Sequence, residues 1–412
     1  MTAPRMTGSE TAEPPHSMEG GISMKKVFVA VALALALLLP RLALGDAPME
    51  EGTPFTLTSP SVILTEIKTG KVIFEKNADE RRPVASVTKV MTILLTLEAI
   101  DEGRVGLGDS VPVSARASGM GGSQVFLDAN RNYKLRDLLK SVIVASANDA
   151  AVALAEYMDG AEEAFVRRMN QRAQELGLTN THYVNCTGLP AQGHYTTARD
   201  VARLSAQLDS HPLYYEFSTI WMDELTHPGG RVTQLTNTNR LIRFYSGCDG
   251  YKTGSTNEAK YCISATAEKN GLRLIAVVLG ANAGQTRFDE ARSMLEYGFS
   301  GYQLFTPVKE GDSLGMQVPV RLGGSDTVPA VSGGTSELLL KKGDQSQIAL
   351  EVALAESVAA PVRKGDVLGE IRVKQGGATV QTLPAIAGET VELPGMINAL
   401  LRIRSHFMLR IK

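Results

Sequence analysis

Three short motifs in the 412-residue chain combine hydroxyl, amine and amide groups that suit nucleophilic catalysis by a serine. They are, in chain order, Ser86-Val87-Thr88-Lys89, Ser146-Ala147-Asn148 and Lys252-Thr253-Gly254. Each motif alone is a weak signal, because the same patterns recur at Ser23–Lys26, Lys68–Gly70 and Ser255–Asn257. Only the first set places a serine at the start of an expected helix, then a polar turn, then Lys-Thr-Gly on a late strand. We therefore interpret that set as one catalytic site.

Ser86 is the expected nucleophile and Lys89 is the expected base. A serine hydroxyl attacks efficiently only when a positioned base takes its proton. Lys89 follows Ser86 by one helical turn, so both side chains share one helix face. An amine accepts a proton only when it is neutral, and burial or a neighbouring cation lowers the pKa of a lysine. We expect Lys252 to be that cation.

The second and third motifs supply groups that could bind a substrate and protonate its leaving group. Ser146 is expected to relay a proton to the leaving nitrogen, and Asn148 is expected to hold both the substrate amide and the catalytic lysine. Lys252, Thr253 and Ser255 form a cationic, hydroxyl-rich edge strand. Such a strand can hold a carboxylate while its backbone pairs with an extended peptide.

Helices and strands that could position these motifs follow from the apolar periodicity. A β-hairpin is expected over Ser61–Glu75, and a helix is expected to begin near Ser86. The polar residues of Ser146–Asn148 are expected to cap a helix. Helices and strands together predict an α/β or α+β domain over residues 46–302. The other expected elements are helices at Leu135–Val144, Ala150–Tyr157, Ala161–Leu176 and Arg287–Tyr297, and strands at Gly250–Ser255, Tyr261–Ala267 and Leu272–Leu279.

The chain changes character after Pro307, where short apolar runs alternate with Gly-Gly, Lys-Gly and Asp-containing turns. This pattern predicts a small all-β domain over residues 303–392. Residues 393–412 place Leu, Met, Ile and Phe side chains on one helical face beside several arginines. We expect an amphipathic helix that lies in a membrane interface; the alternative is a helix packed on the β domain. The expected strands are Met316–Arg321, Ala349–Ala353, Val367–Val373 and Thr379–Leu383.

Residues 1–45 have the pattern of a leader. Met24-Lys25-Lys26 precedes an apolar run from Val27 to Leu39, and Ala43-Leu44-Gly45 resembles a small-residue cleavage site. The run is shorter than the about 20 apolar residues that span a bilayer. We therefore expect a secretory signal peptide rather than an uncleaved anchor. The mature protein would then be exported and peripherally bound to the outer face of the cytoplasmic membrane.

Composition excludes several classes of protein. The net charge of −2 argues against a basic nucleic-acid binder and against an acidic disordered chain. The three cysteines, Cys186, Cys248 and Cys262, are too few and too scattered for a disulfide framework or a thiolate zinc site. The six histidines include no HxxxH pair. We therefore expect no metal and no cofactor.

The stretches around the motifs resemble one family. Asn77–Pro83 ahead of Ser86, Thr179–Pro190 and Gly250–Gly254 look like the low-molecular-mass D-alanyl-D-alanine carboxypeptidases, which are penicillin-binding proteins of the serine type. The resemblance implies a penicillin-recognising, β-lactamase-like fold with helices packed on an antiparallel sheet. It also implies removal of the terminal D-alanine from peptidoglycan pentapeptide stems through an acyl-serine intermediate, with β-lactam antibiotics as covalent inhibitors.

The resemblance also implies residue roles, and two positions depart from the family pattern. Ser255 stands where many members carry His, which bears on substrate preference or rate, and Cys186 stands where Ser is common. The implied roles are Ser86 as nucleophile, Lys89 as base, Ser146 and Asn148 as the second motif, Lys252, Thr253, Gly254 and Arg287 around the substrate carboxylate, and the N–H groups of Ser86 and Ser255 as the oxyanion hole.

Two other functions share part of the pattern. A class A-like β-lactamase uses the same motifs but adds a glutamate that activates water, and residues 176–190 contain no glutamate. A non-catalytic penicillin-binding or cell-wall sensor module would keep the fold and lack the chemistry. The same site chemistry also serves endopeptidase and transpeptidase reactions.

Overall fold

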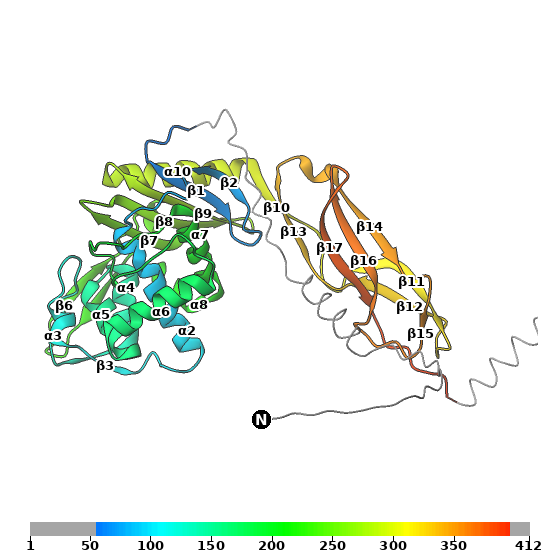
Figure 1. The fold of residues 1–412 in the computed structure, drawn as a ribbon, viewed down its shortest axis with the longest axis horizontal. Helices are drawn as coiled ribbons and strands as arrows, with labels where there is room; N and C mark the ends of the chain where they lie inside the picture. The colour runs from blue at the N-terminus through cyan, green and yellow to red at the C-terminus, as the bar shows by residue number, and fades with distance from the viewer. Residues whose placement is uncertain (1–54, 396–412) are drawn as a thin grey trace, which may run out of the picture. The chain divides into compact units, whose positions relative to one another are not determined.

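The computed structural model describes residues 55–395. The expected leader over residues 1–45 lies outside this range, and so does most of the expected amphipathic helix over 393–412. Within the described range, helices pack on a sheet as far as Gly301, and the chain after it forms mainly strands (Figure 1). No helix of residues 55–395 is both long and apolar enough to cross a membrane.

A five-stranded antiparallel sheet organises the first part, with the strand order β2-β1-β9-β8-β7. Its middle strand is buried almost throughout, which explains the apolar sequence of β9. The strand with the Lys-Thr-Gly motif, β7, lies at one edge, as the sequence predicts. The strands are β1 (Ser61–Glu66), β2 (Val72–Lys76), β7 (Cys248–Thr256), β8 (Lys260–Lys269) and β9 (Leu272–Ala281).

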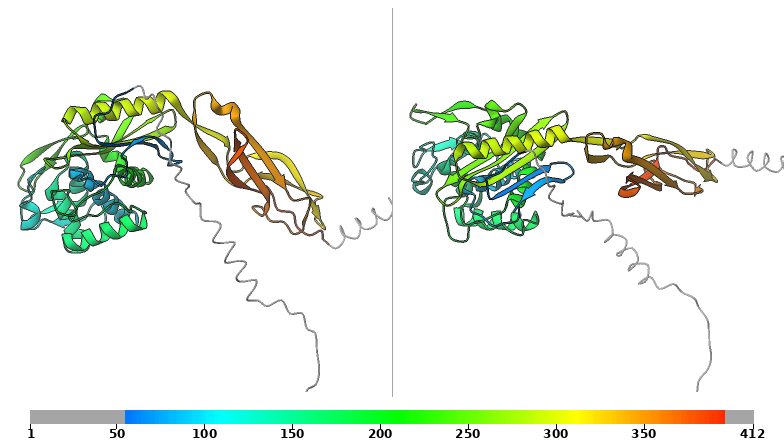
Figure 2. Two further views of the ribbon diagram at one scale, coloured as in Figure 1. Left: turned by 45° about the horizontal axis from the view of Figure 1, so that its top comes forward. Right: turned by 90° about the horizontal axis from the view of Figure 1, so that it is seen from above.

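Each face of this sheet is covered by helices. Successive residues of β1 point to opposite faces, so Val62 and Leu64 join one apolar cluster and Ile63 joins the other. The long helix α10 (Gly284–Gly301) covers the first face (Figure 2). The second face carries α2 (Lys89–Asp101) and most of the other helices, which pack around it. Nearly all residues of α2 are buried, so it is a central helix that holds the first motif rigidly.

The expected hairpin, helices and strands of this part are confirmed within a few residues at their ends. The sequence analysis missed α7, α8 and the β5–β6 hairpin, because the buried face of each has at most two large apolar residues. The other elements are η1 (Ala85–Thr88), β3 (Ser110–Pro112), α3 (Ala115–Ser118), β4 (Asn132–Lys134), α4 (Leu135–Val144), α5 (Asn148–Asp159), α6 (Glu162–Glu175), α7 (Ala198–Gln207), η2 (Leu208–Ser210), α8 (Pro212–Ser218), β5 (Met222–Thr226), β6 (Val232–Thr236) and α9 (Leu241–Phe244).

The second part is built of strands, as predicted from its turn-rich sequence. Six strands form a sheet in the order β14-β16-β17-β12-β11-β15, and β10 pairs with β13. A separate small core of valines, alanines and one leucine fills it. Its elements are β10 (Tyr302–Val308), β11 (Ser313–Arg321), β12 (Thr327–Ser332), β13 (Ser336–Lys341), η3 (Asp344–Gln347), β14 (Ile348–Leu354), β15 (Val358–Ala359), β16 (Val367–Gln375) and β17 (Ala378–Ala387).

Candidate active site

Ser86 lies in η1, a 3-10 helix of one turn that leads directly into α2. The preceding residue, Ala85, has a φ of +50°, a left-handed conformation that is costly for a residue with a side chain. Such strain persists where the surrounding structure fixes it, and it gathers at functional sites. The turn therefore presents Ser86 in one defined position.

Two glycines allow other segments to approach this turn. A Cβ at Gly254 would lie 2.5 Å from the carbonyl oxygen of Val84 and 2.8 Å from the amide nitrogen of Ser86. A Cβ at Gly188 would lie 1.9 Å from the carbonyl oxygen of Ala85. Real Cβ atoms do not fit at such distances, so glycine is required at both positions. Gly254 thereby brings the third motif against the first.

Lys89 is the best-defined group of the site. Its Nζ lies 2.8 Å from Ser86 Oγ and donates to the carbonyl oxygen of Thr187, also at 2.8 Å. The side chain is fully buried, and this burial lowers the pKa of Lys89 to about 7. At neutral pH a large fraction of this amine is therefore uncharged, and it touches the serine oxygen from which it could take a proton.

Burial, one of the two causes expected from the sequence, lowers the pKa of Lys89, and the negative charge of Asp149 acts in the opposite direction. The expected repulsion between the two lysines is present as a lowered pKa of Lys252. Lys252 is itself only 1% exposed, and burial, followed by the charges of Lys89 and Arg287, holds its pKa well below the usual value. Neither lysine forms an ion pair with any residue between 55 and 395. Among the described residues, no carboxylate is therefore in direct contact with either amine.

The second motif lies in the turn between α4 and α5. Ser146 has a φ of +62°, and its Oγ is buried without a hydrogen-bond partner among the described residues. Asn148 donates from Nδ2 to the carbonyl oxygen of Gly121 at 2.7 Å, while its Oδ1 is likewise buried and unpartnered there. The hydroxyl of Ser146 and the side-chain carbonyl oxygen of Asn148 are therefore available for hydrogen bonds to a substrate.

Two expectations about this turn are wrong. The N-cap position of α5 is Ala147, and no side chain of the motif caps the helix. Asn148 also makes no hydrogen bond to Lys89, because its amide nitrogen is held by Gly121 and the Lys89 amine by Ser86 and Thr187. The left-handed backbone of Ser146 turns the motif away from a cap geometry.

Asp149 is a further residue of the site region that the motif analysis missed. Its buried carboxylate accepts the backbone N–H groups of Val125 (3.1 Å), Leu127 (3.1 Å) and Ala150 (2.9 Å). These bonds fix the 121–128 loop, which in turn holds Asn148 through Gly121. The only sequence signal was an acidic residue directly after the motif at a helix start.

The third motif occupies the edge strand β7. Lys252 Nζ donates to the carbonyl oxygen of Thr253 at 3.1 Å, and Thr253 Oγ1 donates to Thr238 Oγ1 at 2.8 Å. Arg287 on α10 contacts the strand and donates to the carbonyl oxygen of Gly254 at 2.9 Å. The Nε of Arg287 is buried without a hydrogen-bond partner in the described part of the chain, and burial lowers the pKa of this guanidinium. The exposed residue Ser255 follows on the same strand.

The structure thus assembles all three motifs and Arg287 around Ser86, although they are far apart in sequence. A model of the D-alanyl-D-alanine carboxypeptidase family matches residues 47–283, more than half of the chain. The chain belongs to this family. A model of the C-terminal domain of penicillin-binding protein 5 matches residues 302–393. The predicted family, fold class and serine hydrolase class are confirmed.

Individual relatives agree with the family match. The D-alanyl-D-alanine carboxypeptidase DacF of Bacillus subtilis (strain 168) is 39% identical over 343 residues, 83% of this chain and 88% of that protein. Penicillin-binding protein 5 from Haemophilus influenzae has a TM-score of 0.72 at 29% identity, covering 83% of this chain and 100% of its own. Penicillin-binding protein D2 from Listeria monocytogenes, in its ampicillin-bound form, has a TM-score of 0.51 at 32% identity, covering 60% and 99%.

In this member of the carboxypeptidase family, a buried histidine supports the first motif. The backbone N–H of Val184 donates to His194 Nδ1 at 3.2 Å, so the proton of the neutral ring is on Nε2. That nitrogen lies 2.8 Å from Thr88 Oγ1 and donates to it. Burial lowers the pKa of His194 to about 4, which keeps the ring neutral at physiological pH. His194 therefore holds the turn of the nucleophile without adding charge.

The three cysteines of this carboxypeptidase family member are buried free thiols. Burial raises the pKa of Cys248 to about 12 and that of Cys262 to about 11, and raises that of Cys186 well above its usual value. Thiols that stay protonated are poor nucleophiles. They pack around the site and take no part in its chemistry.

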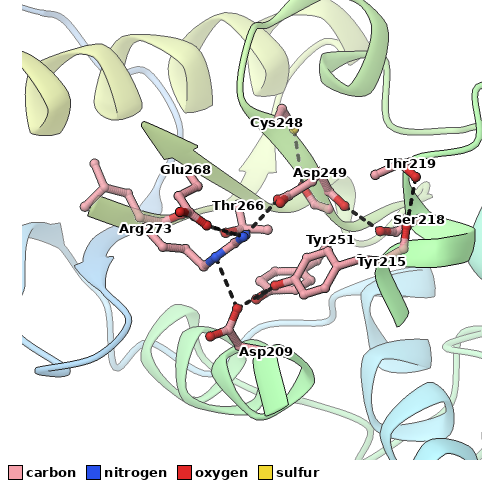
Figure 3. Close-up of polar contacts among 12 residues, drawn as sticks. Asp209, Tyr215, Ser218, Thr219, Cys248, Asp249, Tyr251, Thr266, Glu268 and Arg273 are labelled. Atoms are coloured by element: carbon pink, nitrogen blue, oxygen red, sulfur yellow. Dashed lines mark hydrogen bonds and ion pairs between the residues drawn. The ribbon is translucent and has the colours of Figure 1, made fainter. Parts of the chain in front are cut away.

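A partly exposed ion-pair network around Arg273 holds the start of the third-motif strand (Figure 3). Arg273 on β9 lies 3.1 Å from Asp209, 2.8 Å from Asp249 and 2.7 Å from Glu268. Its guanidinium also stacks over the ring of Tyr215 at 4.8 Å. Asp249 is on β7, three residues before Lys252 of the catalytic strand. One arginine therefore ties the strand of the third motif to β8, β9 and η2.

We expect Arg273→Met to destabilise the protein by about 2 kcal/mol, because it leaves the half-buried Asp249 without its cation, whereas solvent screens the more exposed Asp209 and Glu268. Burial already raises the pKa of Asp249 above its usual value, and the variant removes the cation that opposes this shift. A folded-state pKa above the unfolded value makes the loss larger at pH 8, where Asp249 is charged, than at pH 5, where its protonation relieves part of the cost. Urea unfolding at both pH values measures it.

The matched control for this prediction is Arg372→Met in β16, where an exposed arginine pairs with Glu351 and Glu370. Such a pair is screened by solvent, so stability should hardly change at either pH. Equal behaviour of the two variants would show that the Arg273 network does not stabilise β7.

Proposed function

We propose that this protein removes the terminal D-alanine from peptidoglycan pentapeptide stems through an ester of Ser86. The observation that carries the proposal is the 2.8 Å contact between Ser86 Oγ and Lys89 Nζ, in which the lysine is fully buried and has a pKa of about 7. The family match supports the D-alanyl-D-alanine carboxypeptidase reaction itself.

The chemistry proceeds in two balanced steps. The neutral amine of Lys89 takes the Ser86 proton, and Oγ attacks the carbonyl carbon of the terminal peptide bond. The N–H groups of Ser86 and Ser255 stabilise the negative charge on the carbonyl oxygen. Ser146 delivers a proton to the nitrogen of D-alanine and takes one from protonated Lys89, so both groups return to their starting states. The C–N bond breaks, D-alanine leaves and an acyl-Ser86 ester remains. Water then cleaves that ester and restores the serine hydroxyl.

Recognition of the free terminal carboxylate rests on the third motif. Lys252 and Thr253 line the edge strand, and Arg287 supplies a second cation behind Gly254. Neither cation has an ion-pair partner among residues 55–395, so an anionic substrate would supply the missing charge. Asn148 Oδ1, buried and unpartnered in the same range, suits the N–H of the penultimate residue.

The same site would bind β-lactam antibiotics covalently. A β-lactam carries a carboxylate beside a strained amide, so it offers Ser86 the same two features as the peptide end. The structural relative crystallised in its ampicillin-bound form supports this part of the proposal.

Export and membrane attachment complete the proposal. The charged and apolar pattern of residues 1–45 supports a cleaved signal peptide, and the apolar face of residues 393–412 supports attachment to the outer face of the cytoplasmic membrane. Peptidoglycan stems are reached there. Both segments lie outside the range that the structure describes.

We expect Ser86→Ala to abolish both D-alanine release from a pentapeptide and the mass adduct formed with benzylpenicillin, because the attacking oxygen is gone. Circular dichroism should show an unchanged fold. Mass spectrometry of the native protein should show a stable adduct on Ser86. Rapid adduct turnover would instead favour a β-lactamase, absence of any adduct would favour a non-catalytic module, and activity retained in Ser86→Ala would refute the assignment of the nucleophile.

The pH dependence tests the base. Only the neutral form of Lys89 accepts a proton, so the rate of acylation by benzylpenicillin should fall about tenfold per pH unit below a pKa of about 7 and level off above it. Lys89→Arg should abolish acylation, because a guanidinium stays charged. Lys134→Arg, at an exposed position, should keep the native rate and profile. A midpoint near pH 10 would contradict the proposed base.

Deletion of residues 393–412 should release the protein from vesicles of anionic phospholipid while D-alanine release from a soluble pentapeptide stays unchanged. The apolar face of that segment supplies the membrane affinity. Replacement of Leu400 and Leu401 by Gln within the full chain is the matched control for length and should also weaken sedimentation. A truncated protein that still sediments with vesicles would contradict the attachment.

A further inference from the structure

Thr238 connects two of the catalytic motifs without belonging to either. It lies in the short loop between β6 and α9, and its backbone N–H donates to the carbonyl oxygen of Val144 at 3.1 Å, just ahead of Ser146. Its side-chain Oγ1 accepts the Thr253 hydroxyl at 2.8 Å. One residue therefore touches both the segment that carries the second motif and the carboxylate-binding strand.

The asparagines on either side of Thr238 hold this loop in place. Asn237 donates from Nδ2 to the carbonyl oxygens of Ser218 (2.9 Å) and Ile220 (2.8 Å). Asn239 donates from Nδ2 to the carbonyl oxygen of Gly250 on β7 at 3.0 Å. Both asparagines are buried, whereas Thr238 between them is half-buried. The loop thus presents its hydroxyl from a fixed backbone.

Counting protons identifies an unused donor. Each threonine hydroxyl supplies one hydrogen and two acceptor lone pairs. The hydrogen of Thr253 is bonded to Thr238, and the hydrogen of Thr238 has no acceptor in the part of the chain that the structure describes. This free donor lies beside Thr253, whose carbonyl oxygen accepts the buried amine of Lys252. A donor pair next to an uncompensated cation suits an anionic ligand.

We propose that Thr238 is a further binding residue for the terminal carboxylate of the substrate, which deepens the proposed function and rests on it. When the carboxylate enters, it outcompetes the neutral hydroxyl as an acceptor, because charge-assisted hydrogen bonds are about twice as strong. Thr253 then donates to one carboxylate oxygen and Thr238 to the other. Peptides that end without a free carboxylate leave both donors unpaired, so Thr238 adds to the selectivity for chain ends.

Two substitutions separate the hydroxyl from the rest of the side chain. Thr238→Val keeps the shape and the backbone bond to Val144, and we expect it to raise KM for a D-alanyl-D-alanine peptide about tenfold with kcat within twofold of native. Thr238→Ser keeps the hydroxyl and should stay within threefold of native. Thr236→Val, on the exposed face of β6, is the matched control and should change neither constant.

A double variant, compared with Thr253→Val alone, distinguishes direct contact of Thr238 with the substrate from a role in orienting Thr253. If Thr238 only orients the Thr253 hydroxyl, Thr238→Val should cause no further loss in a Thr253→Val background. Direct contact predicts a further loss of about tenfold in acylation by benzylpenicillin, followed by mass spectrometry over hours.

The proposal is overturned if Thr238→Val stays within twofold of native, if Thr238→Ser is as impaired as the valine variant, or if the double variant loses nothing further. Failure of the proposed function is a separate outcome. In that case the native protein and Thr236→Val would themselves release no D-alanine and form no adduct on Ser86.

Discussion

The structure depends on the burial of one amine against one hydroxyl. Removing Lys89 from water makes its charged form costly, which lowers its pKa to about 7 and lets it act as a base at Ser86. The fold maintains this burial by close backbone approach. Gly188 and Gly254 let two separate segments pack against the turn of the nucleophile, and Thr187 gives Lys89 a neutral acceptor in place of a carboxylate. A carboxylate there would restore the charge and remove the base.

The same logic extends to the rest of the site, where positive groups are buried without ion-pair partners among residues 55–395. Lys252 and Arg287 both have lowered pKa values, and burial is the main cause for each. An uncompensated buried cation destabilises the free protein by several kcal/mol. In the proposed function, a substrate carboxylate would offset that cost on binding and so contribute to affinity for a chain end. The large apolar core around α2 stabilises the folded protein and offsets the destabilisation caused by the buried cations.

The sequence was sufficient to predict features that depend on residues close together along the chain. The helix over Leu135–Val144 follows from its periodicity, and the contact between Ser86 and Lys89 follows from their spacing on a helix. It was insufficient where partners come from distant backbone. The carbonyl oxygen of Thr187, the N–H groups bound by Asp149 and the Thr238–Thr253 pair have no local signature. The prediction that Ser146–Asn148 caps a helix was wrong because Ser146 has a left-handed backbone conformation, and no side chain of the motif bonds to the start of α5.

Strand β7 shows how the fold leaves an edge open for binding. An unpaired strand edge invites aggregation, and natural sheets usually block it with charge or cover. Here β7 is anchored at both ends instead. Arg273 ties its beginning to β8, β9 and η2, and Gly254 seats its later part against the turn of Ser86. Between these anchors, Lys252 and Thr253 line the edge to which the proposed function assigns the substrate carboxylate. In that proposal, specificity for a chain end arises from how the strand is held as well as from the groups that it carries.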